Sequence, residues 1–315
     1  MSQIEELVLS ELRKQPELEA IDRGFRWQRG EDATRLWFCS TSAPGDFGLC
    51  ATAWIETVFG PRIEAPDLVE LGRLNRRACF GSYFSSNGRL GMRASYCIYE
   101  KEPASTWVAI ALLRAMGEQL ALGIGIAHSE FVSASLAGSR ANLEYPRSWG
   151  RTAHTLGFEQ IAASFRERGL MATHGSHGLV LEVPLAGISA SRMLDPKAET
   201  ALLHLSMDVP HPIAGVGYAA TIAFPIDPPS AKIPSICQAL NQAEHAMQDF
   251  VPRLGAWGMR SLDSELVYSL FWPTDQADEG LVITIMSWMI TRTLWIKSQY
   301  WEPGSGLTKL GGAIA

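Results

Sequence analysis

The chain has 315 residues, of which 47% are hydrophobic and 19% charged, and its formal net charge is −6. This composition excludes an intrinsically disordered chain, and the length favours two domains, each large enough to bury its own core. The acidic balance argues against nucleic acid or an anionic membrane as the main partner.

Neither end of the chain carries a clear targeting or membrane signal. The first six residues lack the basic flank and apolar core of a secretory signal, so we expect a cytoplasmic protein. Residues 281–290 are nearly all apolar, but Thr291-Arg292-Thr293 interrupts them, and a membrane span needs about 20 such residues. The sequence therefore predicts a buried helix over 281–300. The cysteines show no metal-binding or redox spacing, and we expect buried free thiols.

The first half of the chain predicts the element order α-β-β-β-α-β-β-α. Apolar residues recur at helical spacing near the N-terminus and again before Gly81, while Asn87-Gly88 is a strong two-residue hairpin turn signal between two strand-like runs. The predicted elements are a helix at 4–15, strands at 25–29, 34–40 and 47–59, a helix at 67–78, strands at 82–86 and 90–99, and a helix at 104–122.

The same order returns in the second half. Leu240-Asn241 aligns with Leu74-Asn75, and the two copies lie roughly 165–175 residues apart, about one domain length. The predicted elements are a helix at 151–167, strands at 171–184, 200–209 and 216–224, a helix at 233–250, strands at 254–261 and 266–272, and a helix at 281–300. We therefore predict a duplicated α+β fold with domains at 1–127 and 149–301, a connector at 128–148 and a flexible tail at 302–315.

No motif in the chain defines a catalytic centre. His174 and His177 are the closest approach to a metal-binding pair, and His204 and His211 follow in the same half, but no Cys, Asp or Glu stands at a ligand-like spacing. A nucleophile elbow is also missing from the sequence. We expect a non-enzymatic protein without metal or cofactor. A metal-dependent hydrolase built on these histidines is an alternative.

Aromatic residues are the more informative feature, because the chain has 10 Trp, many of them on strand-like runs and closing helices. Trp and Tyr combine a large apolar body with a polar group and are enriched at binding surfaces, although most strand aromatics pack in cores. The candidate peptide-binding residues are Trp54, Tyr83, Tyr96 and Tyr99 in the first copy, and Tyr268, Trp272 and Trp295 in the second.

The pattern resembles the type III secretion chaperone-like fold, including the YbjN family of bacterial sensory transduction regulators. The resemblance is carried by Leu71-x-x-Leu74-Asn75-Arg-Arg-x-x-Phe80-Gly81-Ser82, by the Gly88-Arg89-Leu90 turn and by Arg93-Ala-Ser-Tyr96. The second copy departs from it, since residues 245–250 replace the Arg-Arg-x-x-Phe stretch. The resemblance implies an acidic chaperone that often dimerises and holds a partner polypeptide extended along its surface.

Together these features favour a chaperone or adaptor that binds a protein or peptide. An alternative is a regulatory module that binds a small ligand between its two domains. Duplication has a further physical consequence, because two copies on one chain can pack as an intramolecular pseudo-dimer. We expect such a monomeric pseudo-dimer, or a homodimer, with the shared surface supplied by the final helices at 104–122 and 281–300 or by the sheets.

Overall fold

The computed structural model contains two six-stranded antiparallel sheets with helices packed on them. It describes residues 3–42, 49–60, 65–76, 81–99, 157–175, 178–184, 200–211, 215–225, 233–246, 253–259, 265–273 and 279–300, with single positions between 109 and 120. The predicted connector at 128–148 and tail at 302–315 lie outside these residues.

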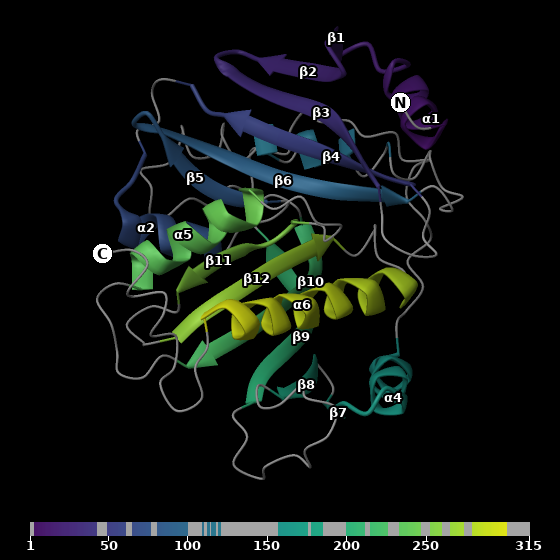
Figure 1. The fold of residues 1–315 in the computed structure, drawn as a ribbon, viewed down its shortest axis with the longest axis vertical. Helices are drawn as coiled ribbons and strands as arrows, with labels where there is room; N and C mark the ends of the chain where they lie inside the picture. The colour runs from purple at the N-terminus through teal and green to yellow at the C-terminus, as the bar shows by residue number, and fades with distance from the viewer. Residues whose placement is uncertain are drawn as a thin grey trace.

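The first half forms a sheet with strand order β1-β2-β3-β4-β6-β5 (Figure 1). α1 (Gln3–Leu12) precedes the sheet, α2 (Leu68–Arg76) connects β4 to β5, and helical positions between 109 and 120 follow β6. The strands are β1 (Glu19–Ile21), β2 (Gly24–Arg29), β3 (Asp32–Ser42), β4 (Leu49–Val58), β5 (Ser82–Ser86) and β6 (Arg89–Tyr99).

The second half repeats this arrangement, with strand order β11-β12-β10-β9-β8-β7. α4 (Phe158–Glu167) precedes its sheet, α5 (Ile233–Ala246) connects β10 to β11, and α6 (Glu279–Tyr300) follows β12. The strands are β7 (Met171–His174), β8 (Gly178–Pro184), β9 (Thr200–His211), β10 (Gly215–Pro225), β11 (Ala256–Met259) and β12 (Glu265–Pro273). None of the described helices has the length and apolarity that a membrane crossing needs.

The predicted duplicated α+β fold is confirmed, but each half has one strand more than predicted. β1 spans three residues, too few for an alternating pattern to be recognised. The predicted strand at 171–184 is two strands, β7 and β8, because the chain turns between them and the Gly175 amide donates a hydrogen bond to the Gly178 carbonyl at 2.9 Å. The predicted Asn-Gly hairpin is confirmed, with φ of 52° at Asn87 and 74° at Gly88.

A matched pair of asparagines shows how closely the two halves correspond. The Asn75 side chain on α2 accepts a hydrogen bond from the Tyr83 amide at 2.7 Å and donates one to the Tyr83 carbonyl at 3.1 Å. The Asn241 side chain on α5 makes the same two hydrogen bonds with the Trp257 backbone, both at 2.9 Å. Each buried amide thus joins the middle helix to the strand that follows it. The Leu-Asn alignment predicted from the sequence therefore marks equivalent positions.

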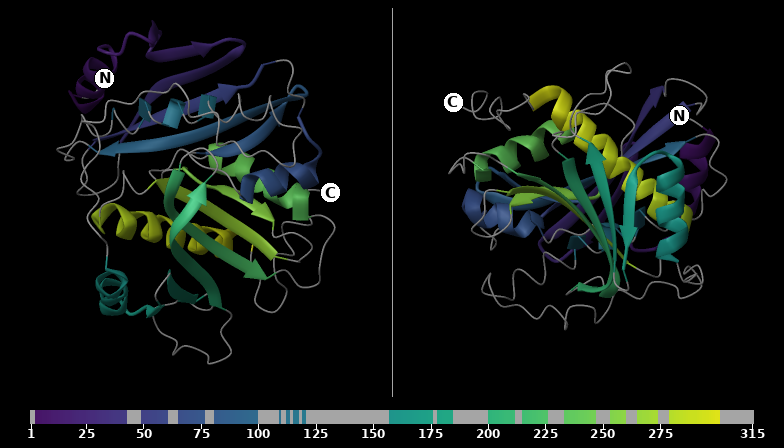
Figure 2. Two further views of the ribbon diagram at one scale, coloured as in Figure 1. Left: turned by 180° about the vertical axis from the view of Figure 1, so that it is seen from behind. Right: turned by 90° about the horizontal axis from the view of Figure 1, so that it is seen from below.

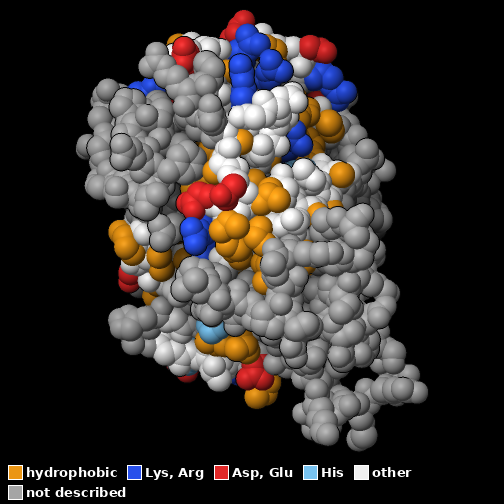
Figure 3. Space-filling model, turned by 90° about the vertical axis from the view of Figure 1, so that its left-hand side faces the viewer, with side chains coloured by type: hydrophobic (Ala, Val, Ile, Leu, Met, Phe, Trp, Pro, Cys, Tyr) orange, Lys and Arg blue, Asp and Glu red, His pale blue; other side chains and the backbone are white. Residues whose placement is uncertain are grey.

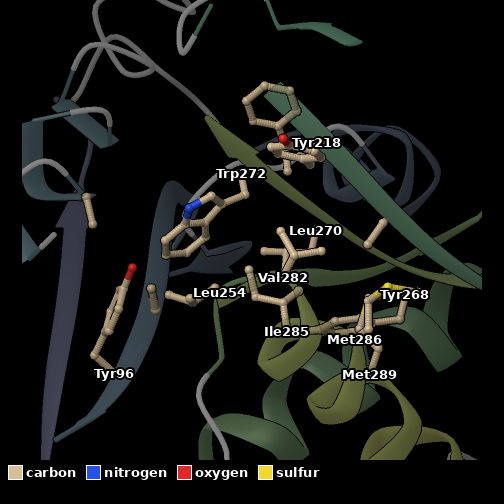
Figure 4. Close-up of a cluster of buried hydrophobic side chains, with 14 of the residues drawn as sticks. Tyr96, Tyr218, Leu254, Tyr268, Leu270, Trp272, Val282, Ile285, Met286 and Met289 are labelled. Atoms are coloured by element: carbon tan, nitrogen blue, oxygen red, sulfur yellow. The ribbon is translucent and has the colours of Figure 1, made fainter. Parts of the chain in front are cut away.

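The inner faces of both sheets contribute to one continuous apolar core. In the first sheet Leu36, Phe38, Ile55 and Ala94 face the helices, and in the second Leu203, Ile222, Leu270 and Trp272 do so. Tyr96 of the first half and Trp272 of the second approach each other across this core, with ring centroids 6.3 Å apart (Figure 4). Side chains of both sheets therefore contribute to the contact between the two halves. The sheets were one of the two sources of this contact that we expected from the sequence.

The two middle helices supply a further part of the contact between the halves (Figures 1 and 2). α2 of the first half packs against β11 and α5 of the second half, and α5 approaches β5. The approach to β11 is close, since a Cβ added at Gly258 would lie 2.7 Å from the Arg76 amide nitrogen and 2.8 Å from the Gly72 carbonyl oxygen. α6 packs on β9 and β10 of its own sheet, and most of the helix predicted at 104–122 lies outside the described residues, so a shared surface supplied by the final helices stays a prediction.

Candidate functional site

The outer face of the first sheet is the most distinctive surface of the described residues. Strand alternation places Thr34, Leu36 and Phe38 on the inner face and leaves Ala33, Arg35 and Trp37 on the outer face of β3. Their partners on β4 are Val58, Glu56 and Trp54, in that order. We call these six residues the open strip. Arg35 and Val58 are exposed and the other four side chains are partly exposed.

The aromatic end of the open strip is a stacked tryptophan pair. The Trp37 and Trp54 ring centroids lie 6.4 Å apart with an interplanar angle of 15°. The second half borders this pair, because the Arg253 guanidinium lies 5.9 Å from the Trp54 ring centroid and the His245 ring centroid lies 6.0 Å away. Trp54 is therefore held between Trp37 and the second half, which leaves Trp37 as the more freely available ring.

The other end of the open strip opens into a hollow of about 280 Å³. The described residues that line it all belong to the first half: Glu31, Ala33, Arg35, Glu56, Val58, Phe59 and Arg89. The Arg93 side chain donates a hydrogen bond from Nε to Glu56 Oε2 at 2.6 Å, and its Nη2 donates to the same oxygen. Figure 3 shows basic side chains gathered at the top of one side of the molecule, over the first sheet.

The second half is joined to this face by backbone and side-chain hydrogen bonds. Ser95 of β6 and Arg253 exchange two backbone hydrogen bonds, at 3.1 and 2.9 Å. Ser82 Oγ and His245 Nε2 lie 2.6 Å apart and share a hydrogen bond. Burial, together with the nearby Arg93, Arg253 and Arg292, lowers the pKa of His245 to about 3. The imidazole is therefore neutral at this boundary at ordinary pH.

A buried charge network lies directly behind that boundary. The Arg292 Nε donates to both carboxylate oxygens of Glu244, at 3.2 and 3.1 Å, and the Trp257 indole donates to Glu244 Oε1 at 2.6 Å. Arg253 Nε lies 4.0 Å from Glu244 Oε2. The two arginines and Glu244 are each less than 7% exposed, so one carboxylate connects α5, α6 and the segment that reaches Ser95.

The structure places most of the predicted peptide-binding aromatics in the core. Tyr83, Tyr96, Tyr268 and Trp272 are all at most 4% exposed, so their side chains pack inside the protein and do not form a surface. This corrects the expectation of surface contacts at these four positions, because their strands are covered on that face by helices and by the other half.

Three predicted residues remain to be placed. Trp54 lies on the open strip, and Trp295 on α6 is partly buried against the core cluster, so a binding role for these two stays a prediction. Tyr99 belongs to β6, where it pairs with Cys50, and its side chain is outside the described part of the structure.

The histidines of the alternative metal site do not converge where they are described. His174 pairs with Leu179 and shares its face of the second sheet, whereas His204 pairs with Val180 on the opposite face. His177 and the side chain of His211 lie outside the described residues. Within the described part of the chain, His, Cys, Asp and Glu form no cluster of three that fits a metal ion. The geometry therefore does not support a site shared by His174 and His204.

The sequence-based candidates missed Trp37, Arg35 and Arg89. The signal for the first two was present, because Ala33, Arg35 and Trp37 alternate with three residues of a buried face. No sequence pattern points to Arg89. It lies at the hollow because the β5–β6 hairpin places β6 beside β4.

Comparison with known proteins found no match to any family model, curated protein or solved structure.

Proposed function

We propose that this chain is a non-enzymatic chaperone or adaptor that binds an extended polypeptide segment on the open strip. The resemblance to secretion-chaperone and YbjN proteins implies this class of function. The observation that carries the proposal is the stacked Trp37–Trp54 pair, partly exposed on a sheet face beside charged side chains. Aromatic residues in such settings supply much of the binding energy of protein interfaces.

The spacing of the open strip suits an extended chain. Its three cross-strand rows are Ala33 with Val58, Arg35 with Glu56, and Trp37 with Trp54. Successive rows are two residues apart, about 6.6 Å along the strand. An extended peptide presents side chains to one side with the same repeat, so a ligand lying along β3 and β4 meets an apolar, a charged and an aromatic row in turn.

The second sheet does not repeat these side chains. The equivalent strands β9 and β10 present Leu202 opposite Ala223 and His204 opposite Thr221 on their outer face. These rows carry no Trp, Tyr or Phe. The proposed binding surface is therefore a property of the first half, while the second half contributes Arg253 and His245 to its border.

Replacing Trp37 by Ala tests this assignment. We expect the affinity for a polypeptide that copurifies with the protein, or for a peptide selected on it, to fall about 10-fold or more, because interface tryptophans often contribute over 1 kcal/mol. The melting temperature should change little, since Trp37 is partly exposed. The measurement is fluorescence anisotropy of the labelled peptide.

A matched control is available on the neighbouring strand. Trp27 of β2 pairs with Thr34, whose side chain faces the core, so Trp27 belongs to the opposite face of the same sheet. Trp27→Ala should leave the affinity unchanged as long as the variant is folded. Equal losses in both variants, or no loss in Trp37→Ala, would refute a binding role for the outer face.

A further inference from the structure

We infer that the bound segment carries an acidic side chain next to its apolar contact, and that Arg35 and Arg89 hold this carboxylate in the hollow. The inference rests on the proposed function and names the class of polypeptide that the open strip accepts. Arg35 belongs to the row between the hollow and the tryptophan pair, and Arg89 reaches the hollow from β6.

The charges around the hollow leave these two guanidinium groups available. Glu56 is already bound by Arg93. The Asp32 carboxylate is directed inward, where it accepts a hydrogen bond from the Gly60 amide at 2.6 Å, and burial raises its pKa. Arg35 and Arg89 are exposed and have no hydrogen bond or ion pair to a described residue. The lining of the hollow carries two guanidinium groups, of Arg35 and Arg89, and two carboxylates, of Glu31 and Glu56, and the second of these carboxylates is paired with Arg93.

The shape and lining of the hollow favour a carboxylate side chain over a larger ligand. At about 280 Å³ it lies just below the range of small-molecule pockets, which is about 300–1,000 Å³. Ala33, Val58 and Phe59 form apolar walls beside the charged groups. Apolar walls strengthen a charge–charge contact by lowering the local dielectric constant, and guanidinium groups match the planar geometry of a carboxylate.

The geometry also sets a sequence pattern for the ligand. Arg35 and Trp37 are two residues apart on β3, about 6.6 Å along the strand. An extended ligand with its acidic side chain at Arg35 therefore places the side chain two positions away over the tryptophan pair. The chain as a whole has a net charge of −6, so a general attraction for acidic peptides is not expected. A preference for such peptides would thus report on this local site.

The test is selection from a random 12-residue peptide library displayed on phage, with the full-length protein as bait, followed by anisotropy with the synthetic selected peptides. We expect enrichment of Asp or Glu two positions from an aromatic or aliphatic residue. Arg35→Gln and Arg89→Gln should each weaken binding about 3- to 10-fold, the range for one partly exposed charge pair. Arg168→Gln, an exposed arginine of the second half, should have no effect.

The outcomes separate this inference from the proposed function. The inference would be overturned by selected peptides that lack acidic residues, or by acidic peptides whose affinity does not change in Arg35→Gln and Arg89→Gln. The proposed function would still stand in either case if Trp37→Ala weakens binding. Failure to enrich any peptide would overturn both. Replacing the acidic residue of a selected peptide by its amide gives the reciprocal check, since wild-type and Arg35→Gln proteins should then bind it with equal affinity.

Discussion

Glu244→Gln is expected to lower the free energy of unfolding by about 3–5 kcal/mol, the usual cost of removing one partner of a buried ion pair. Glu244 is 6% exposed and accepts hydrogen bonds from Arg292 and from the Trp257 indole. Gln keeps an oxygen for the indole but removes the charge that both Arg292 and Arg253 approach. The guanidinium groups are then left in a buried site without this carboxylate.

Because Arg253 pairs with Ser95 of the first sheet, the loss should weaken the contact between the halves as well as the second half itself. Urea unfolding followed by tryptophan fluorescence measures the change. Glu70→Gln is a matched control, since Glu70 forms a Glu–Arg pair with Arg73 on α2 in which the Arg73 side chain is 51% exposed and the Glu70 side chain 29% exposed. Its effect should be below about 0.5 kcal/mol. Similar effects of the two substitutions would contradict the structural role of the buried network.

Asn75→Ala and Asn241→Ala should each destabilise the protein by about 2–4 kcal/mol, because each removes two hydrogen bonds from a buried backbone N–H and C=O. The side chains are 1% and 3% exposed, and water has little access to the groups left behind. The two costs should be similar, since the two asparagines make the same pair of bonds in the two halves.

Asn241→Asp tests the two hydrogen bonds of Asn241 individually. It keeps the acceptor for the Trp257 amide but replaces the donor by a charged oxygen that faces the Trp257 carbonyl, so it should be at least as destabilising as Ala. Gln242→Ala, at the exposed neighbouring position of α5, is the control and should change the free energy of unfolding by less than about 0.5 kcal/mol. If thermal unfolding shows that Asn241→Ala is as stable as Gln242→Ala, the asparagine hydrogen bonds do not join helix and strand in the way that we infer.

Local signals account for the part of the fold that the sequence predicts well. The Asn87-Gly88 turn sets the β5–β6 hairpin because both residues adopt positive φ, which few other pairs tolerate. The Leu-Asn pairs at 74–75 and 240–241 revealed the duplication because the same short motif performs the same task in both halves. Such features depend on neighbouring residues and are therefore visible in the sequence.

The contact between the halves was not predictable in this way. Ser82 bonds to His245 and Ser95 pairs with Arg253, residues more than 150 positions apart. Period-two alternation places Ser95 on the outer face of its strand, which normally means exposure. In the structure Ser95 is 0% exposed because the second half covers it. A pattern indicates which face a side chain belongs to, but not what lies against that face.

The same limit explains why the sequence pointed to buried aromatic residues as binding candidates and not to Trp37. Tyr96 and Trp272 were selected as aromatics on strands, and the structure shows that they meet in the core between the two sheets. Trp37 was not selected, although it is partly exposed and stacks on Trp54. Aromatic content alone does not separate core from surface. The alternation along β3, combined with knowledge of which face the helices cover, makes that separation.

Site-specific photo-crosslinking tests the central claim, that the outer face of the first sheet binds a polypeptide, most directly. A photoreactive phenylalanine analogue would replace Trp37 in one protein and Leu202 in another, the latter 40% exposed on the outer face of the equivalent strand β9. We predict that irradiation of cells producing each protein gives discrete polypeptide adducts from position 37 and none from position 202. Adducts from neither position, or the same adducts from both, would contradict the account.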